Sequence, residues 1–339
     1  MIEIDGSFGE GGGQILRTSS ALAALTGQAM RISAIRAGRP KPGLMRQHLA
    51  AVRAVAAICG GELQGDELHS QELVFSPGAI RGGNYRFAVG SAGNAVLIAQ
   101  AVLPPLLHAG TPSHVRIEGG THTANAPLFE FFQNVFLPCL REMGAKVTAR
   151  LVRTGFYPAG GGVLELDVQP LEQAREFTRM DRGNIRAARI AALGHGIDRQ
   201  ILVDEIDLCR EMADLPDAAG EIDDRDSAGP GNALYIEIES EHATELFGVC
   251  GDVTLSRRHV AKRAAGMAAH YRQEEVPVWR FLADQLLLPM ALGAGGRFRT
   301  VPPTPHTQTN AAVIGRFLPE VGIEMKNLQN GQYIIEVKK

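Results

Sequence analysis

A histidine near the C-terminal end lies in a sequence context that could support phosphoryl transfer. His306 belongs to the stretch Thr304-Pro305-His306-Thr307-Gln308-Thr309-Asn310, which follows a predicted strand over residues 297–301 and two prolines. Threonine and asparagine are favoured helix N-caps, so we expect His306 on the loop that leads into a helix. Free N–H groups and a positive dipole at a helix start suit a phosphate, and a neutral imidazole beside a phosphate can be a nucleophile. Taken alone, the stretch favours a plainer interpretation, a histidine that caps or packs on a loop.

A glycine-rich loop near the N-terminus is the second candidate for ligand contact. The loop reads Gly9-Glu10-Gly11-Gly12-Gly13-Gln14. Glycines let a ligand approach the backbone and expose its N–H groups. The loop matches neither a Walker loop nor the pattern G-x-G-x-x-G, which argues against a simple nucleotide-binding motif. Glu10 is a candidate metal carboxylate, and an acid favoured by a helix dipole is an equally good interpretation.

Basic residues cluster in the N-terminal part of a chain whose formal net charge is −3. Arg36 and Arg39 lie in a Gly/Pro loop, which favours phosphate recognition because the guanidinium fork matches phosphate oxygens. The cluster also contains Arg17, Lys41, Arg46 and Arg53, of which we interpret Lys41 and Arg53 as ordinary surface charge. The net charge argues against a general nucleic-acid coat, so contact with a polyanion requires a local basic patch.

Polar residues interrupt an apolar helix pattern at residues 281–285. Asp284 and Gln285 either cap this helix or bind a ligand, whereas Leu282 is expected in the core. The remaining histidines show no metal-ligand spacing. The single tryptophan and five tyrosines give no stacking platform of the kind that single-strand-binding proteins use.

The order of predicted elements recurs three times along the chain. Each unit reads strand, helix, strand, helix, strand, strand, with similar spacing, which argues for duplication of one unit. The first unit has strands at 2–5, 30–35, 62–64 and 72–76 and helices at 14–25 and 44–59. The second has strands at 85–89, 114–118, 146–151 and 163–168 and helices at 94–108 and 127–143. The third has strands at 176–180, 297–301, 322–326 and 333–337 and helices at 281–292 and 309–318.

Residues 183–279 interrupt the third unit. Within them we expect strands at 185–193 and 233–238, a helix at 257–271, and an acidic, flexible turn at 221–231. The segment is long enough to form a domain. We therefore expect a large domain of residues 1–182 and 280–339, and a small inserted domain of residues 183–279.

Composition indicates an ordinary globular protein. Of 339 residues, 45% are hydrophobic and 21% are charged. The cysteines Cys59, Cys139, Cys209 and Cys250 are far apart, which fits free thiols in a reducing cytosol. We see no leader and no apolar run of membrane length, and we expect a cytoplasmic protein without membrane contact.

Together these stretches resemble the RNA 3′-terminal phosphate cyclases. The resemblance covers essentially the whole chain, and its matching pieces stand in one order: Asp5-Gly6, Gly9-Glu10-Gly11-Gly12-Gly13-Gln14-Ile15-Leu16-Arg17, Arg36-Ala37-Gly38-Arg39-Pro40-Lys41-Pro42-Gly43-Leu44, Gln47-His48-Leu49, Gly90-Ser91-Ala92-Gly93, Gly155-Phe156-Tyr157-Pro158-Ala159-Gly160-Gly161-Gly162 and Ala283-Asp284-Gln285. The resemblance implies an α/β fold (α+β layers). It consists of three βαβαββ units like the C-terminal domain of translation initiation factor three, plus a thioredoxin-like insert.

The resemblance also implies a ligase reaction and its site. The enzyme would use ATP to convert an RNA 3′-phosphate to a 2′,3′-cyclic phosphate, with release of AMP and pyrophosphate. The intermediates would be a histidine-AMP adduct on His306 and an RNA-adenylate. Glu10 would bind Mg²⁺ or Mn²⁺. The implied ATP contacts are Gln100, Pro127, Phe281, Leu282, Ala283, Asp284 and Gln285, and the implied contacts to the RNA phosphate are Arg17, Arg36, Arg39 and Gln47. Phe281 occupies a position that can be tyrosine in the family, so adenine stacking is expected without a hydroxyl contact.

Two other functions compete with this one. The family includes non-catalytic, cyclase-like proteins of ribosome biogenesis that lack the nucleophile, whereas His306, Glu10 and Arg39 are all present here. A carboxyvinyl transferase of the enolpyruvyl type is built from similar repeats but would need neither His306 nor ATP. The sequence leaves the physiological RNA, the preferred metal and the oligomeric state open, a homodimer included.

Overall fold

Three four-stranded sheets share one strand order in this computed structural model, which describes all 339 residues. The first sheet consists of β1 (Ile2–Asp5), β2 (Met30–Ser33), β4 (Leu73–Ser76) and β3 (Glu62–Gln64). The second consists of β5 (Asn84–Ala88), β6 (Ser113–Gly119), β8 (Gly162–Val168) and β7 (Val147–Arg153). The third consists of β9 (Phe177–Arg179), β14 (Gly296–Thr300), β16 (Tyr333–Lys338) and β15 (Gly322–Asn327). In every sheet the first two strands are parallel and the others antiparallel, which confirms the threefold repeat.

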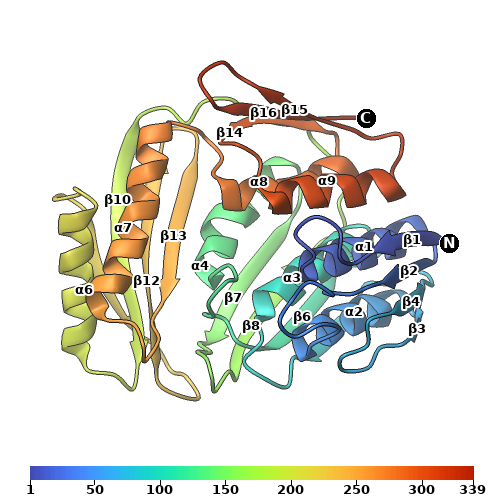
Figure 1. Cartoon of the computed structure of the whole chain (residues 1–339), viewed down its shortest axis with the longest axis horizontal. Helices are drawn as coiled ribbons and strands as arrows, with labels where there is room; N and C mark the ends of the chain where they lie inside the picture. The colour runs from blue at the N-terminus through green and yellow to red at the C-terminus, as the bar shows by residue number, and fades with distance from the viewer.

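The helices of the three units face one another between the sheets (Figure 1). The first unit contributes α1 (Gly13–Thr26) and α2 (Arg46–Cys59), and the third contributes α8 (Arg280–Leu292) and α9 (Pro305–Phe317). The second contributes α3 (Ala95–Leu107) and a helical segment of three parts, α4 (Phe129–Phe131), a π-helical turn η1 (Phe132–Phe136) and α5 (Leu137–Glu142). A single helix over 127–143 was predicted for this segment. One apolar core runs through all three units, so the polar residues on these inward helix faces need a separate explanation.

The segment 183–279 forms a fourth sheet with its own helices (Figure 1). Its elements are β10 (Ile185–His195), α6 (Arg199–Met212), β11 (Ala219–Asp224), β12 (Gly231–Ser240), β13 (Thr244–Cys250) and α7 (Arg257–Glu274), and its strand order is β11-β10-β12-β13. Strand β11 is parallel to β10 and the other pairs are antiparallel, which agrees with the expected thioredoxin-like topology.

One expectation inside this segment was wrong, and one helix was not expected. Residues 221–224, predicted as part of a flexible turn, lie in strand β11, because an edge strand can expose its carboxylates to water while Ile222 packs inward. Helix α6 was not predicted. Its start is marked by Asp198, whose side chain accepts from the N–H of Gln200, but the buried Glu205 breaks the apolar stripe that identifies a helix.

The fourth sheet packs on both faces. Ile190 and Ala192 of β10 point to a smaller apolar core with α6 and α7, whereas the alternate residues Ala191 and Leu193 join the main core. This alternation is the period of two that a strand imposes. Trp279, the last residue of the segment, and Val301, which lies outside it, also belong to the smaller core. The domain boundaries at residues 182/183 and 279/280 stay predictions. None of the helices combines the length and the apolar character that a membrane span requires.

Candidate active site

A cavity of about 860 Å³ lies among helices of all three units. Almost all of the predicted site residues line it, namely Glu10, Arg17, Arg36, Arg39, Gln47, Gln100, Pro127, Phe281, Asp284, Gln285 and His306. Leu282 and Ala283 do not, because the helical turn directs their side chains into the core, where they are 0% and 1% exposed. Contact between these two residues and ATP stays a prediction for the backbone of α8.

His306 is the second residue of helix α9, not part of a preceding loop. The helix begins at Pro305 rather than near Thr309, since proline is tolerated at the first helical position, where its missing N–H would have no partner. Thr304 caps the helix, and its hydroxyl oxygen accepts from the N–H of Thr307 at 3.2 Å. The imidazole therefore sits at the positive end of the helix dipole and faces the cavity.

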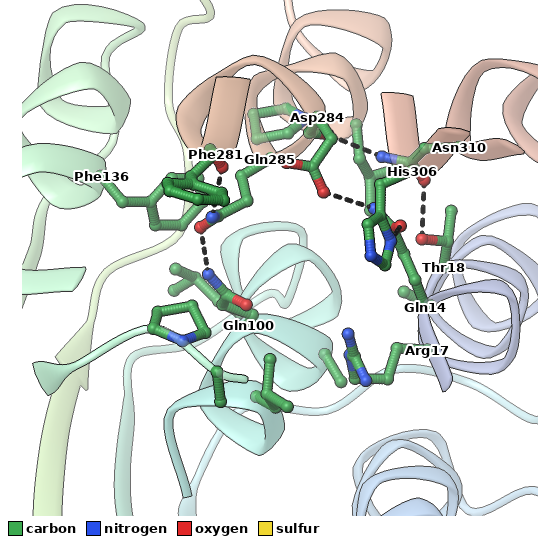
Figure 2. Close-up of a pocket in the computed structure, with 18 of the residues that line it drawn as sticks. Gln14, Arg17, Thr18, Gln100, Phe136, Phe281, Asp284, Gln285, His306 and Asn310 are labelled. Carbon is green, nitrogen blue, oxygen red and sulfur yellow. Dashed lines mark hydrogen bonds between the residues drawn. The ribbon is translucent and has the colours of Figure 1, made fainter. Parts of the chain in front are cut away.

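A chain of hydrogen bonds connects His306 to α1 and α8 (Figure 2). The carboxylate of Asp284 accepts from Nε2 of Gln14 at 2.7 Å. This bond directs Oε1 of Gln14 to Nδ1 of His306, also at 2.7 Å. An amide oxygen only accepts, so Nδ1 of His306 must carry the proton, and Nε2 keeps its lone pair. The residues select the tautomer that a nucleophilic Nε2 requires.

Two further bonds hold Asp284 and its helix in place. The side-chain amide of Asn310 donates to the backbone carbonyl of Asp284 at 2.7 Å, and the hydroxyl of Thr18 donates to Oδ1 of Asn310 at 2.8 Å. These bonds join α9, α8 and α1 beside the imidazole (Figure 2). Gln14, Thr18 and Asn310 were not predicted as site residues. Gln14 adjoins the predicted glycine loop, but its partners are remote in sequence.

The electrostatics of the site favour a neutral imidazole and a bound anion. Partial burial, and then the charges of Arg17 and Arg39, lower the pKa of His306 below its ordinary value. Burial lowers the pKa of Arg17 to about 10, and this guanidinium forms no hydrogen bond to another residue. Burial also raises the pKa of Asp284 to about 7. An arginine in a cavity wall without a bonded partner is well suited to phosphate oxygens.

The glycine loop brings a carboxylate to the same place. Glu10 forms an ion pair with Arg39, and its Oε2 lies 3.6 Å from Nδ1 of His306. The backbone N–H of Glu10 donates to the hydroxyl of Thr309 at 3.1 Å, which ties the loop to α9. The chain contains no cluster of three or more histidine, cysteine or acidic side chains that could hold a metal. Glu10 could therefore supply one ligand of a cation whose other ligands are not side chains.

Arg36 and Gln47, the other two predicted contacts to the RNA phosphate, form hydrogen bonds within the protein. Arg36 donates to the carbonyls of Lys41 and Gly43, at 2.6 and 2.9 Å, which braces the loop that carries Arg39. Gln47 accepts from the backbone N–H of Asn94 at 2.6 Å and so connects the first unit to the second. His48, which was not predicted, also lines the cavity. Burial, Arg17 and Arg36 lower its pKa to about 3, so it is neutral.

The far side of the cavity is less charged and offers an aromatic face. Phe281 is 47% exposed, and Gln285 donates to its carbonyl at 2.6 Å. Gln100 of α3 donates to the side-chain oxygen of Gln285, so the amides of two units meet here (Figure 2). An exposed ring beside amide groups can stack on a nucleobase and hydrogen bond to its edge.

Comparison with known proteins identifies the family. Residues 8–323 match the family model described as RNA 3′-terminal phosphate cyclase. An RNA 3′-terminal phosphate cyclase from Koribacter versatilis (strain Ellin345) is 44% identical over 331 residues, which span 97% of this chain and 93% of that protein. The crystal structure of the enolpyruvyl transferase NikO from Streptomyces tendae covers 99% of this chain and 48% of its own, at 12% identity and a TM-score of 0.37, a likeness too weak to carry an argument. On the family match and the identity to the Koribacter protein, the chain belongs to the RNA 3′-terminal phosphate cyclase family.

Proposed function

We propose that His306 carries AMP from ATP to the 3′-phosphate of an RNA, which then closes to a 2′,3′-cyclic phosphate. RNA 3′-terminal phosphate cyclase activity and the use of ATP follow from the family, and the covalent route is the proposal. The observation that carries it is the bond from Nδ1 of His306 to Gln14, because it leaves Nε2 unprotonated at the cavity.

Three displacements account for the reaction. First, Nε2 of His306 attacks the α-phosphorus of ATP, an N–P bond forms and pyrophosphate leaves. Second, an oxygen of the RNA 3′-phosphate attacks the same phosphorus, and the N–P bond breaks to return the neutral imidazole. Third, the adjacent 2′-hydroxyl attacks the activated 3′-phosphate, loses its proton and displaces AMP. The last step is intramolecular, so proximity supplies much of its rate, and it requires a ribose.

The positions of the cavity residues suggest how the substrates are divided. The ring of Phe281 and the amides of Gln100 and Gln285 suit the adenine. Arg17 lines the same cavity, is close enough to His306 to lower the pKa of the imidazole, and can neutralise the transferred phosphate. Arg36, Arg39 and Gln47 would hold the terminal phosphate of the RNA.

The site offers a divalent cation one carboxylate ligand. Glu10 is one carboxylate beside the predicted triphosphate position, and magnesium in phosphoryl-transfer enzymes is typically held by one or two carboxylates plus phosphate oxygens. When bound there, Mg²⁺ or Mn²⁺ would neutralise charge on the phosphates. Glu10 would then leave its ion pair with Arg39 to bind the cation, which would free the guanidinium of Arg39 for the RNA phosphate.

The test is to incubate the protein with ATP labelled at the α-phosphate. The wild type should acquire an adduct that survives alkali and breaks down in acid, as a phosphoramidate does, and peptide mass spectrometry should place AMP on His306. His306→Asn should abolish labelling while still cyclising an RNA supplied already adenylated at its 3′-phosphate. Label on a lysine, or undiminished labelling of the variant, would exclude the proposal. A folded wild type that binds RNA but never labels would favour the non-catalytic alternative.

A further inference from the structure

An exposed surface beside the cavity is not used by the proposed reaction. It consists of Arg46 at the start of α2, the loop Gly90-Ser91-Ala92 before α3, and Tyr157 in the loop between β7 and β8. We call these residues the outer rim. Tyr157 is 70% exposed, so most of its ring is accessible to a ligand.

Close contacts make the outer rim one surface and join it to the cavity. Nη1 of Arg46 lies 3.3 Å from the carbonyl oxygen of Gly90. A side chain at Gly160 would place its Cβ 2.9 Å from Cα of Ala92, so the Tyr157 loop packs directly on the Gly90 loop. Gln47, the neighbour of Arg46, lines the cavity and accepts from the N–H of Asn94 just beyond the same loop. The rim therefore begins where the predicted contacts to the RNA phosphate end.

The polar groups of the outer rim suit a nucleic-acid strand, which carries anionic phosphates and flat bases. Arg46 is exposed and forms no ion pair. The backbone N–H groups of Gly90, Ser91 and Ala92 donate to no protein acceptor, and Gly90 has a φ of 67°, in the left-handed region that favours glycine. Successive free N–H groups in such a loop form a concavity for anions. Beside them, Arg153 donates to the carbonyl of Gly161 at 2.6 Å and likewise forms no ion pair.

We propose that the outer rim binds the nucleotides on the 5′ side of the reacting RNA end, with Tyr157 stacking on a base and Arg46 and the Gly90 loop contacting a phosphate. This inference rests on the proposed function, since it assumes that the RNA end enters beside Gln47. A stacked base is recognised through its face, so the rim is tolerant of sequence. The rim offers one aromatic residue with adjacent cations rather than an array of rings.

The experiment measures cyclisation of a single-stranded decanucleotide RNA with a 3′-phosphate. Removing one stacking ring typically weakens single-strand binding by about 5- to 150-fold, so Tyr157→Ala should raise KM by a factor in this range with little change in kcat. Tyr157→Phe keeps the ring and should retain the wild-type KM. Arg46→Ala should lower the slope of log KM against log salt by about 0.7, as expected for one lost phosphate contact on a single strand.

Labelling by ATP separates this inference from the proposed function. All three rim variants should label at the wild-type rate, because the rim does not contact the nucleotide. Val253→Ala and Arg316→Ala, at exposed positions outside the cavity and the rim, are the matched controls and should change neither KM nor the salt slope. Normal labelling with an unchanged KM in Tyr157→Ala and an unchanged slope in Arg46→Ala would overturn the inference. If Tyr157→Ala folds poorly and labels slowly, the slope of Arg46→Ala decides the question.

Discussion

Replacing Asp284 by asparagine should slow adenylation by releasing the Gln14 amide. A carboxylate only accepts hydrogen bonds, so Asp284 holds Nε2 of Gln14 and turns Oε1 toward His306. Asparagine can donate as well as accept. The Gln14 amide can then turn over and donate to Nδ1 of His306, which moves the imidazole proton to Nε2, the nitrogen that is to attack ATP.

The expected loss follows from the strength of the bond that is exchanged. A hydrogen bond to a charged group contributes about 1.5–3 kcal/mol net, and a neutral one about 0.5–1.5 kcal/mol. The Asp284→Asn substitution therefore weakens the preference for the reactive arrangement by about 1 to 1.5 kcal/mol. That difference corresponds to an adenylation rate about 5- to 12-fold below that of the wild type at alkaline pH.

The pH dependence gives a second, independent signature. Burial raises the pKa of Asp284 to about 7, so this side chain gains a proton as the pH falls through neutrality and can then donate to Gln14. The pKa of His306 is lowered, so the imidazole protonates only in more acidic solution. Wild-type adenylation should thus fall in two steps, the first near pH 7. Asp284→Asn should lack the first step and keep the second.

The assay is single-turnover labelling at saturating ATP over a pH series, which separates the chemical step from nucleotide affinity. Asp66→Asn makes the same chemical change at a surface carboxylate that pairs with Arg53, and it should leave the wild-type profile unchanged. An Asp284→Asn profile that superimposes on the wild type in both rate and shape would show that the carboxylate does not set the tautomer.

Four further substitutions test other parts of the structure. Glu10→Ala should weaken adenylation, which labelling by ATP measures. Arg39→Ala should instead impair use of the RNA end, which cyclisation measures. Full activity of both variants in both assays would show that the loop is not part of the site. His122→Ala should lower the free energy of unfolding by about 3–5 kcal/mol, because buried Glu130 loses its 2.7 Å partner; denaturant unfolding measures this, and unchanged stability would show that Arg225 alone suffices. Burial raises the pKa of Glu245 to about 8, so its ionisation destabilises the fold as the pH rises from the ordinary carboxyl range to about 8. Glu245→Gln should therefore flatten this decline in thermal stability, and melting temperatures that fall in parallel with the wild type would contradict it.

Local patterns in the sequence sufficed to predict most of the fold. The repeated order of strands and helices is visible because apolar spacing and glycine positions are local properties, and the three sheets confirm it. Prediction failed where a tertiary contact replaces the local signal. Strand β11 exposes its acids at a sheet edge, and α6 has a buried Glu205 that accepts from Asn232, so neither shows the apolar pattern of its element.

The same distinction applies to the site. Residue type and local motif indicated His306, Glu10 and a basic cluster, of which Arg17, Arg36 and Arg39 line the same cavity as His306 and Glu10. The Gln14–Asp284 bond could not be predicted, because it joins residues 270 positions apart and depends on how two helices meet. The start of α9 was misplaced for a smaller reason, since proline at a first helical position resembles a helix breaker when only the sequence is considered.

The repeat itself explains why these residues converge. The first helix of each unit faces the centre, and its sixth residue is Thr18 in α1, Gln100 in α3 and Gln285 in α8, each polar in a largely buried helix. The second helices of the first and third units behave alike, since Gln47 and His306 are both second residues, in α2 and α9. Equivalent positions of a duplicated unit thus meet around one cavity, and their differences give each unit its own task. In the third unit that position carries the imidazole, and the first unit supplies the glutamine that orients it.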